Sequence, residues 1–230
     1  MNILAMETSG KTFSVAVFSE GTVKGEVFLN TGNTHSETLL PAAQNLLKNL
    51  NLSLAGIDKF AVCSGPGSFT GIRIAMTAAK VFAQSLDKPL VSIDSLTLLE
   101  HAVPVIKNIK VVAAIDALRD EVYTKTSKGI VIKNINKFVQ ELSKYKGKVL
   151  IAGNAALKYR EVIKKGLSAF SVSLDENFHY PKASVLACLA STQKGVSFDK
   201  AEPLYLRRSW AEEVTPRANK KVKLNSKRKK

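Results

Sequence analysis

The first thirty residues predict a three-stranded antiparallel sheet. Residues 2–6 are mostly apolar, and residues 13–18 and 23–29 alternate between large apolar side chains and smaller or polar ones. Gly-containing turns at residues 9–11 and 20–21 separate the three runs. Alternating runs joined by such turns are typical of consecutive strands. We therefore expect the chain to open with three strands that pair in sequence order.

The next segment predicts a helix with an unusual proline. Apolar residues recur at spacings of three and four, at Leu39, Leu40, Ala43, Leu46, Leu47 and Leu50. Thr34 and Glu37 have the spacing of a capping box, which would start the helix at residue 35. Pro41 would then lie inside the helix, where it removes a backbone hydrogen bond. A start near Ser36 or Thr38 would instead place Pro41 in the first turn.

The rest of the chain predicts two similar halves. The first half continues with a strand at residues 59–63, a helix at 72–86, a strand at 90–93 and a helix at 95–101. The second half repeats this order, with strands near 110–116, 122–126, 129–132 and 148–152 and helices near 135–144, 155–165 and 181–193. This repetition predicts a duplicated α/β architecture. We expect a first lobe over residues 1–103, a smaller second lobe over 104–216 and a tail over 217–230.

A glycine-rich loop between a strand and a helix is the strongest chemical signal. It runs Ser-Gly-Pro-Gly-Ser-Phe-Thr-Gly over residues 64–71. The backbone amides at Gly65, Gly67, Ser68 and Gly71 could approach an anion at the helix N-terminus. A rigid turn whose glycines permit close packing, with Ser68 capping the helix, explains the same residues. The loop has neither the Lys-Ser/Thr end of a Walker A motif nor the spacing of a dinucleotide fingerprint.

Two further positions are weaker candidates for nucleotide or phosphate binding. Thr8 and Ser9 lie in the turn between the first two predicted strands, where hydroxyls and free amides could hold phosphate oxygens. Asp116 ends an apolar strand and could bind a metal ion or a nucleotide hydroxyl. Ordinary turn formation and capping explain these residue types equally well. The candidate nucleotide site is therefore Thr8, Ser9, Gly65, Gly67, Ser68, Gly71 and Asp116.

Zinc ligands and nucleophilic motifs are missing from the sequence. His35, His101 and His179 are isolated from one another, and Cys63 and Cys188 form no CxxC motif. We predict two buried structural thiols and no bound metal. The N-terminus has no basic segment before its apolar residues, and no apolar run approaches the roughly 20 residues of a membrane span. We expect a cytoplasmic protein that does not enter a membrane.

The positive charge is concentrated at the C-terminus. The chain has 34 basic and 19 acidic residues, a formal charge of +15. Eight basic residues and no acidic residue lie in the tail: Arg217, Lys220, Lys221, Lys223, Lys227, Arg228, Lys229 and Lys230. The remaining chain carries +7. Such a tail cannot bury enough apolar surface to order itself. It could contact RNA phosphates, or it could simply be a solubilising tail, which its lack of aromatic residues for base stacking favours.

Several segments, in order along the chain, resemble the TsaB (YeaZ) family. They are ILAMETSGKTFSVAVFSEG, THSETLLPAAQNLL, GPGSFTGIRIAMTAAKVFA, VAAIDALRDEVY, FHYPKASVLACLA and PLYLR. The resemblance implies an actin-like ATPase fold with two ribonuclease H-like lobes. It also implies a non-catalytic subunit that binds the paralogous subunit TsaD as a heterodimer and joins the ATPase TsaE in a ternary complex. That complex transfers threonylcarbamoyl from threonylcarbamoyl-adenylate to the adenosine beside the anticodon of tRNAs reading codons that start with A.

The resemblance also assigns roles to particular residues. Two metal-binding histidines of TsaD, four residues apart, correspond to Ser95 and Leu99, so ATP and metal are expected to belong to the partner subunits, with no cofactor held firmly here. Family members pair through helices of the first lobe, and an isolated chain can pair with itself. The corresponding interface is His35, Leu39, Leu40, Ala43, Leu47, Ile74, Ala75, Ala78, Ala79 and Phe82. One face of each of these helices must also cover its own sheet.

Two other functions are compatible with such a fold. A stand-alone actin-like ATPase or phosphotransferase would need a bound nucleotide and a carboxylate base, for which Glu7 and Asp116 are the candidates. A metalloprotease, a label also attached to this superfamily, is disfavoured by the missing histidine pair. Two departures from the family pattern affect the site. Glu7 stands where many members have Asp, and Leu118 stands where an Arg is common.

Overall fold

The first lobe is built around a five-stranded mixed sheet. The computed structural model describes residues 1–30, 35–167, 170–172 and 178–207. The strands are β1 (Ile3–Glu7), β2 (Phe13–Ser19), β3 (Thr22–Leu29), β4 (Lys59–Gly65) and β5 (Leu90–Asp94), in the spatial order β3-β2-β1-β4-β5. The first three strands are antiparallel, and β4 and β5 run parallel to β1. The predicted opening meander is confirmed.

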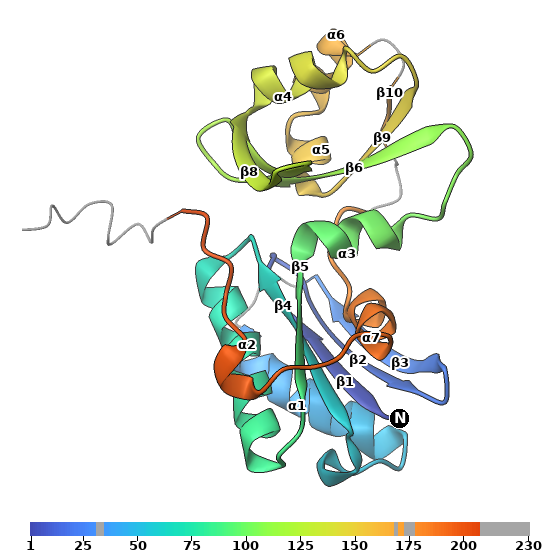
Figure 1. The fold of residues 1–230 in the computed structure, drawn as a ribbon, viewed down its shortest axis with the longest axis vertical. Helices are drawn as coiled ribbons and strands as arrows, with labels where there is room; N and C mark the ends of the chain where they lie inside the picture. The colour runs from blue at the N-terminus through green and yellow to red at the C-terminus, as the bar shows by residue number, and fades with distance from the viewer. Residues whose placement is uncertain (31–34, 168–169, 173–177, 208–230) are drawn as a thin grey trace, which may run out of the picture.

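The second lobe repeats this topology. Its strands are β6 (Ile109–Asp116), β7 (Glu121–Thr126), β8 (Gly129–Asn134), β9 (Lys148–Ala152) and β10 (Phe170–Val172), in the order β10-β9-β6-β7-β8. Strands β6 to β8 form an antiparallel meander, and β9 and β10 extend the sheet in parallel. Figure 1 shows the second lobe above the first. The predicted fold class, α/β with two lobes that each have a mixed sheet flanked by helices, is confirmed.

Helices α1 (His35–Asn49) and α2 (Phe69–Ser85) cover one face of the first sheet. Both are amphipathic, and their apolar stripes join the side chains of β1, β2 and β4 in one core. The short 3-10 helix η1 (Leu54–Gly56) follows α1. Helix α1 begins at His35, one residue before Ser36, and Pro41 lies inside it, so the expectation that Pro41 lies in the first turn is wrong. Thr34, the proposed cap, lies outside the described residues.

Helix α7 (Ala183–Ser191) corrects the expected domain boundaries. It packs on the other face of the first sheet, where Ala183, Leu186 and Ala190 join the core formed by β1, β2, β4 and β5. The backbone amide of Ala183 donates a hydrogen bond of 2.7 Å to Ser14 Oγ in β2. The short 3-10 helix η3 (Phe198–Lys200) then packs near α2. The chain therefore returns to the first lobe, and residues 104–216 do not all belong to the second.

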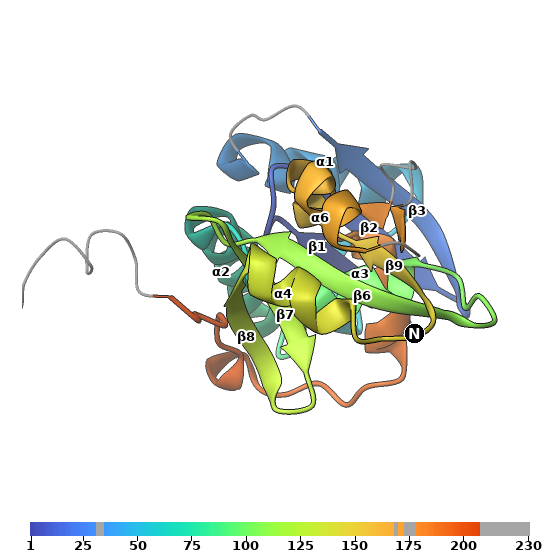
Figure 2. The same ribbon diagram turned by 90° about the horizontal axis from the view of Figure 1, so that it is seen from above.

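Helices α4 (Ile135–Leu142), α5 (Asn154–Lys158) and α6 (Arg160–Gly166) cover the second sheet. Figures 1 and 2 show α4 and α6 on the side of this sheet away from the first lobe. Helix α3 (Ser95–Ala102) lies on the other side, between the two sheets, where Leu96 and Leu99 pack against second-lobe residues. No helix among the described residues is long and apolar enough to span a membrane.

Candidate functional site

The glycine-rich loop connects β4 to α2 and packs against the turn between β1 and β2. The Ser68 side chain caps α2 by accepting a hydrogen bond of 3.2 Å from the amide of Gly71. The Ser68 amide donates to the carbonyl oxygen of Ser9 at 2.7 Å. The Thr8 hydroxyl donates to the carbonyl oxygen of Gly71 at 2.6 Å. These bonds hold the two segments together without a ligand.

Close packing explains the glycines of this loop. A Cβ atom at Gly67 would lie 2.1 Å from the carbonyl oxygen of Ser9, and one at Gly71 would lie 2.0 Å from that of Thr8. Gly65 has a φ of +93°, in the region that favours glycine. The sequence allowed either an anion-binding loop or a rigid turn whose glycines permit close packing. These distances support the close-packing interpretation.

A pocket of about 300 Å³ lies where the two lobes meet. Four of the predicted nucleotide-site residues line it, namely Ser9, Gly67, Ser68 and Asp116. The other three, Thr8, Gly65 and Gly71, are outside this lining and are buried. The remaining lining residues were not predicted: Gly10, Lys11, Ile115, Leu118, Asn154, His179, Tyr180 and Pro181. The duplication could have indicated Asn154, because it follows β9 as the glycine-rich loop follows β4.

Asp116 is fully engaged at the rim of this pocket. Its carboxylate accepts hydrogen bonds from Lys158 Nζ at 2.8 Å, from the Tyr159 hydroxyl at 3.0 Å and from the amide of Leu118 at 3.0 Å. The bond to Leu118 is a turn bond within the loop after β6. Lys158 ends α5 and Tyr159 follows it; Lys158 supplies the opposite charge, and both side chains fix the position of the carboxylate. A carboxylate held in this way is a poor general base.

Glu7, the other candidate base, is completely buried. Its Oε1 atom accepts hydrogen bonds from the Ser9 amide, at 2.7 Å, and from the Ser9 hydroxyl. Its Oε2 atom has no hydrogen-bond partner among the residues that the structure describes. Burial raises the pKa of this carboxyl from 4.5 to about 7. The same burial raises the pKa of the neighbouring Cys63 thiol well above its usual range. Neither group lines the interlobe pocket.

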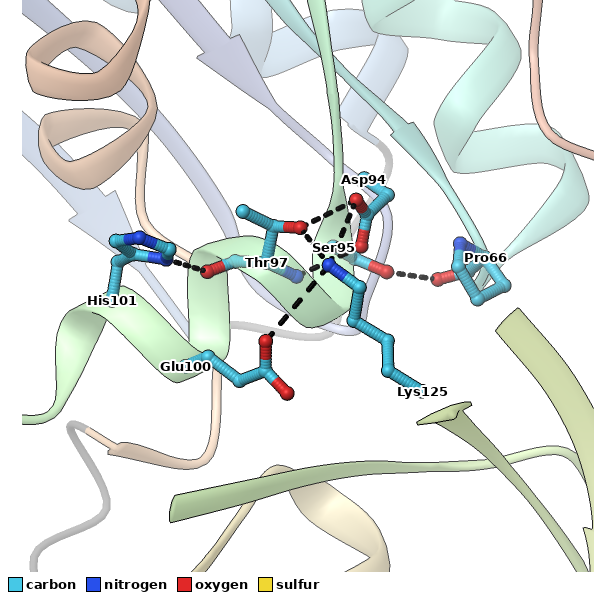
Figure 3. Close-up of polar contacts among 7 residues, drawn as sticks. All are labelled: Pro66, Asp94, Ser95, Thr97, Glu100, His101 and Lys125. Carbon is cyan, nitrogen blue, oxygen red and sulfur yellow. Dashed lines mark hydrogen bonds and ion pairs between the residues drawn. The ribbon is translucent and has the colours of Figure 1, made fainter. Parts of the chain in front are cut away.

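Ser95 and Leu99, the two positions at which the resemblance predicts that metal ligands of TsaD are replaced, are buried within the protein. Ser95 is fully buried, and its hydroxyl donates to the carbonyl oxygen of Pro66 at 2.6 Å (Figure 3). Leu99 is fully buried in the apolar cluster between α3 and the second sheet. Within the described part of the chain, no group of three or more His, Cys, Asp or Glu side chains could hold a metal ion.

A cation from the second lobe lies beside these positions. Lys125 Nζ, on β7, lies 3.6 Å from Asp94 Oδ2, 3.9 Å from Glu100 Oε2 and 2.5 Å from Thr97 Oγ1 (Figure 3). Asp94 also caps α3 by accepting a hydrogen bond of 2.8 Å from the Thr97 amide. Partial burial raises the pKa of Glu100 above its usual value. This cluster connects the two lobes.

An apolar groove of about 600 Å³ lies between α1 and α2 on the first lobe. Its lining is Ser36, Leu39, Leu40, Phe69, Thr70, Arg73, Ile74, Thr77, Ala78, Val81 and Phe82. Leu40 and Val81 are 48% and 50% exposed, which is unusual for large apolar side chains on one concave surface. The groove is larger than the pocket between the lobes.

The predicted interface residues divide between this groove and the core. The groove is lined by five of them: Leu39, Leu40, Ile74, Ala78 and Phe82. Four others are buried against the sheet and outside the lining: Ala43, Leu47, Ala75 and Ala79. His35 is also outside it, and its Nε2 atom lies 3.0 Å from the carbonyl oxygen of Gly10. Val81 and Phe69 were missed, although Val81 continues the i, i+3/i+4 spacing from Ile74 and Ala78.

The C-terminal end of the described chain joins the groove to the second lobe. The Leu204 amide donates to the carbonyl oxygen of Ser64 at 2.8 Å, and the ring of Tyr205 stacks on that of Phe69 with centroids 4.8 Å apart. Arg207 then forms an ion pair with Glu121 at the start of β7. The predicted basic tail, including Lys220, lies outside the described residues.

Comparison with known proteins gives consistent matches over most of the chain. The family model for TsaD, tRNA N6-adenosine threonylcarbamoyltransferase, matches residues 27–221. The chain is 31% identical to the tRNA threonylcarbamoyladenosine biosynthesis protein TsaB of Bacillus subtilis, over 92% of this chain and 96% of that one. It is 30% identical to TsaB of Escherichia coli, over 94% and 99% of the two chains.

A solved structure agrees with these sequence matches. YeaZ from Pseudomonas aeruginosa superimposes with a TM-score of 0.71 at 27% identity, covering 89% of this chain and 99% of that one. The shared length includes both lobes, so the similarity is not limited to the glycine-rich loop. This chain therefore belongs to the TsaB (YeaZ) family, the tRNA threonylcarbamoyladenosine biosynthesis proteins, and is a subunit of that tRNA modification system.

Proposed function

We propose that this chain is a non-catalytic subunit that binds and activates a TsaD-type catalytic subunit through the groove between α1 and α2. The observation that carries this proposal is the groove itself, where Leu40 and Val81 are about half exposed beside Ile74 and Ala78. Contiguous exposed apolar surface of this kind marks protein interaction sites. The small side chain of Ala78 allows a partner helix to approach closely.

The chemistry of the remaining site supports an accessory role. Ser95 and Leu99 supply no metal-binding imidazole, and Asp116 is neutralised by Lys158. In this proposal the catalytic subunit holds the metal ion, and ATP hydrolysis belongs to a TsaE-type ATPase in a ternary complex. The transferred group is threonylcarbamoyl, carried from threonylcarbamoyl-adenylate to the adenosine beside the anticodon. tRNA is bound through the complex in the cytoplasm, and the isolated chain pairs with itself through the same groove.

Replacing Val81 by Glu tests the groove. Val81 is half exposed, so the variant folds, but pairing would place an unpaired carboxylate in an apolar interface. We expect a loss of about 2 kcal/mol or more, roughly a 30-fold weaker Kd for the TsaD-type subunit. Calorimetry or gel filtration of the mixture measures this loss, and the rate of tRNA modification should fall in parallel.

Val105→Glu is the matched control. Val105 is fully exposed and lies outside the groove, so the same substitution there should leave association unchanged. The proposal fails if wild-type protein does not associate with the catalytic subunit, or if that subunit modifies tRNA equally well alone. Equal weakening by both variants would place the interface elsewhere.

A stand-alone ATPase or phosphotransferase remains the second candidate because the interlobe pocket exists. Its polar lining includes Lys11 and Ser68, which suit an anion. However, the Asp116 carboxylate accepts hydrogen bonds from three donors, and Glu7 is completely buried and does not line the pocket. The described residues therefore place no free carboxylate base in it, which favours the accessory role.

A further inference from the structure

The net positive charge of residues 1–216 comes from the second lobe. Residues 104–167 contain fourteen basic and five acidic side chains, a net charge of +9. Residues 1–103 contain seven basic and eight acidic side chains, a net charge of −1. Residues 168–216 also carry −1, with five basic and six acidic side chains. A charge difference of this size between two lobes of similar fold indicates an electrostatic role for one of them.

Much of this charge gathers at one edge of the second sheet. Strands β6 and β9 are parallel and both begin at this edge, and the chain reaches it from the ends of α4 and α6. A small cavity of about 60 Å³ is lined by Ser143 and Tyr145 after α4 and by Gly166 at the end of α6, so these two helix ends are in contact. We call the cations there the basic edge: Lys110, Lys144, Lys146, Lys164 and Lys165.

The basic edge is exposed to solvent. All five of its lysines are exposed. Among the described residues, one of the five lysines forms an ion pair: Lys164 Nζ lies 3.7 Å from Glu161 Oε1. The Glu161 side chain is 77% exposed. The nearby Glu141 is instead paired with Lys133. Internal pairing therefore neutralises little of this charge.

An aromatic side chain lies among these cations. Tyr145 is 44% exposed, and Lys110 Nζ lies 5.1 Å from the centroid of its ring. The ring covers Gly147, where a Cβ atom would lie 2.6 Å from a ring carbon. The contact with Gly147 holds the Tyr145 ring in place, and part of the ring stays accessible to solvent. An exposed aromatic ring between cations suits a nucleic acid, whose phosphates meet the cations and whose unpaired bases stack on the ring.

We infer that the basic edge binds the phosphate backbone of RNA, with Tyr145 available to stack on an unpaired base. The inference rests on the proposed function, because tRNA is the polyanion that a subunit of a tRNA-modifying complex encounters. The elements that carry the edge belong to the second lobe, whereas the groove lies between α1 and α2 of the first lobe (Figures 1 and 2). A catalytic subunit in the groove would therefore leave the edge accessible.

The test removes three of the charges from the full chain as K144Q/K146Q/K165Q. The matched control is K48Q/K194Q/K200Q, which removes three exposed lysines outside the second lobe. Binding of unmodified tRNA is measured between 50 and 300 mM salt (roughly the range in which counterion release is resolved), for the isolated chain and for its complex with the catalytic subunit. We expect the edge variant to make the slope of log K against log salt shallower by about two to three and to weaken binding about 10- to 100-fold. The control variant should do neither.

Further measurements separate this inference from the proposed function. Neither triple variant should change association with the catalytic subunit, and Tyr145→Ala should weaken tRNA binding more than Tyr145→Phe does. If edge and control variants bind tRNA equally, the inference is wrong even when the heterodimer forms. It is also wrong if the edge variant loses binding to anionic vesicles alone. If the chain binds tRNA through the edge but never joins a catalytic subunit, the proposed function fails and this inference stands.

Discussion

At the scale of single residues, Glu7 shows how strongly burial changes a side chain. Its carboxyl is completely enclosed, one oxygen has no hydrogen-bond partner in the described part of the chain, and its pKa is raised to about 7. In the unfolded chain the pKa returns to about 4.5. Between these values the folded protein holds a proton that the unfolded chain has released. Folding stability therefore falls as pH rises from about 4.5 to about 7, and the penalty is constant above that.

Glu7→Gln should remove this pH dependence while keeping an acceptor for the Ser9 amide. We expect the free energy of unfolding of the Gln variant to exceed that of wild type by about 2.5 kcal/mol more at pH 8 than at pH 5. Urea denaturation at both pH values measures it. A difference between the proteins that is the same at both pH values would show that Glu7 does not titrate in this range.

At the same scale, Gly71 tests whether packing explains the glycine-rich loop. Alanine is a better helix former than glycine, so Gly71→Ala in the first turn of α2 would stabilise the protein if space allowed. A Cβ atom there would lie 2.0 Å from the carbonyl oxygen of Thr8, which is backbone and cannot rotate away. We therefore expect destabilisation by about 2 kcal/mol or more, measured by thermal or urea unfolding.

Gly10→Ala, in the turn that contacts this loop, is the control for that measurement. The nearest atom to a Cβ at Gly10 is 3.7 Å away, an ordinary contact distance. The control should change stability by less than about 0.5 kcal/mol. A stabilised Gly71→Ala protein would mean that the loop does not pack as described.

At the scale of elements, local patterns predicted most of the helices and strands. A short apolar run predicted β1, the alternating runs predicted β2 and β3, and the stripe of leucines predicted α1 despite Pro41. The sequence did not show which residues of each helix face the sheet and which face the groove. Ala75 and Ala79 face the sheet, whereas Ile74 and Ala78 line the groove, because adjacent positions on a helix point in different directions. The sequence predicted both pairs as interface residues.

At the scale of the whole molecule, Lys125 connects the lobes. It reaches from β7 to Asp94, Thr97 and Glu100 at the start of and along α3 (Figure 3). Lys125→Gln should lower the free energy of unfolding by about 1 kcal/mol at low salt, because the side chains are about one-third exposed or less. The loss should shrink at high salt as the charges are screened.

The control for Lys125 is Lys128→Gln on the same hairpin. Lys128 is exposed, and the described residues record no ion pair for its side chain. Urea unfolding of the three proteins at low and high salt should distinguish Lys125→Gln from wild type and from Lys128→Gln. If both substitutions have equal effects, the charge of the hairpin matters and the specific interlobe contact does not.

Sequence alone determined the kind of most elements, the duplication and the family, because these depend on local periodicity and on long, ordered motif matches. It missed the short strand β10 and the division between α5 and α6. Tertiary structure decided where α7 packs: Ala183 bonds to Ser14, 169 positions earlier in the chain. It also decided that Lys158 and Tyr159 occupy the carboxylate of Asp116, and that Val81 is left exposed in the groove. A local pattern shows which face of an element is apolar. The path of the whole chain decides which surface that face meets, and therefore which groups remain free to act.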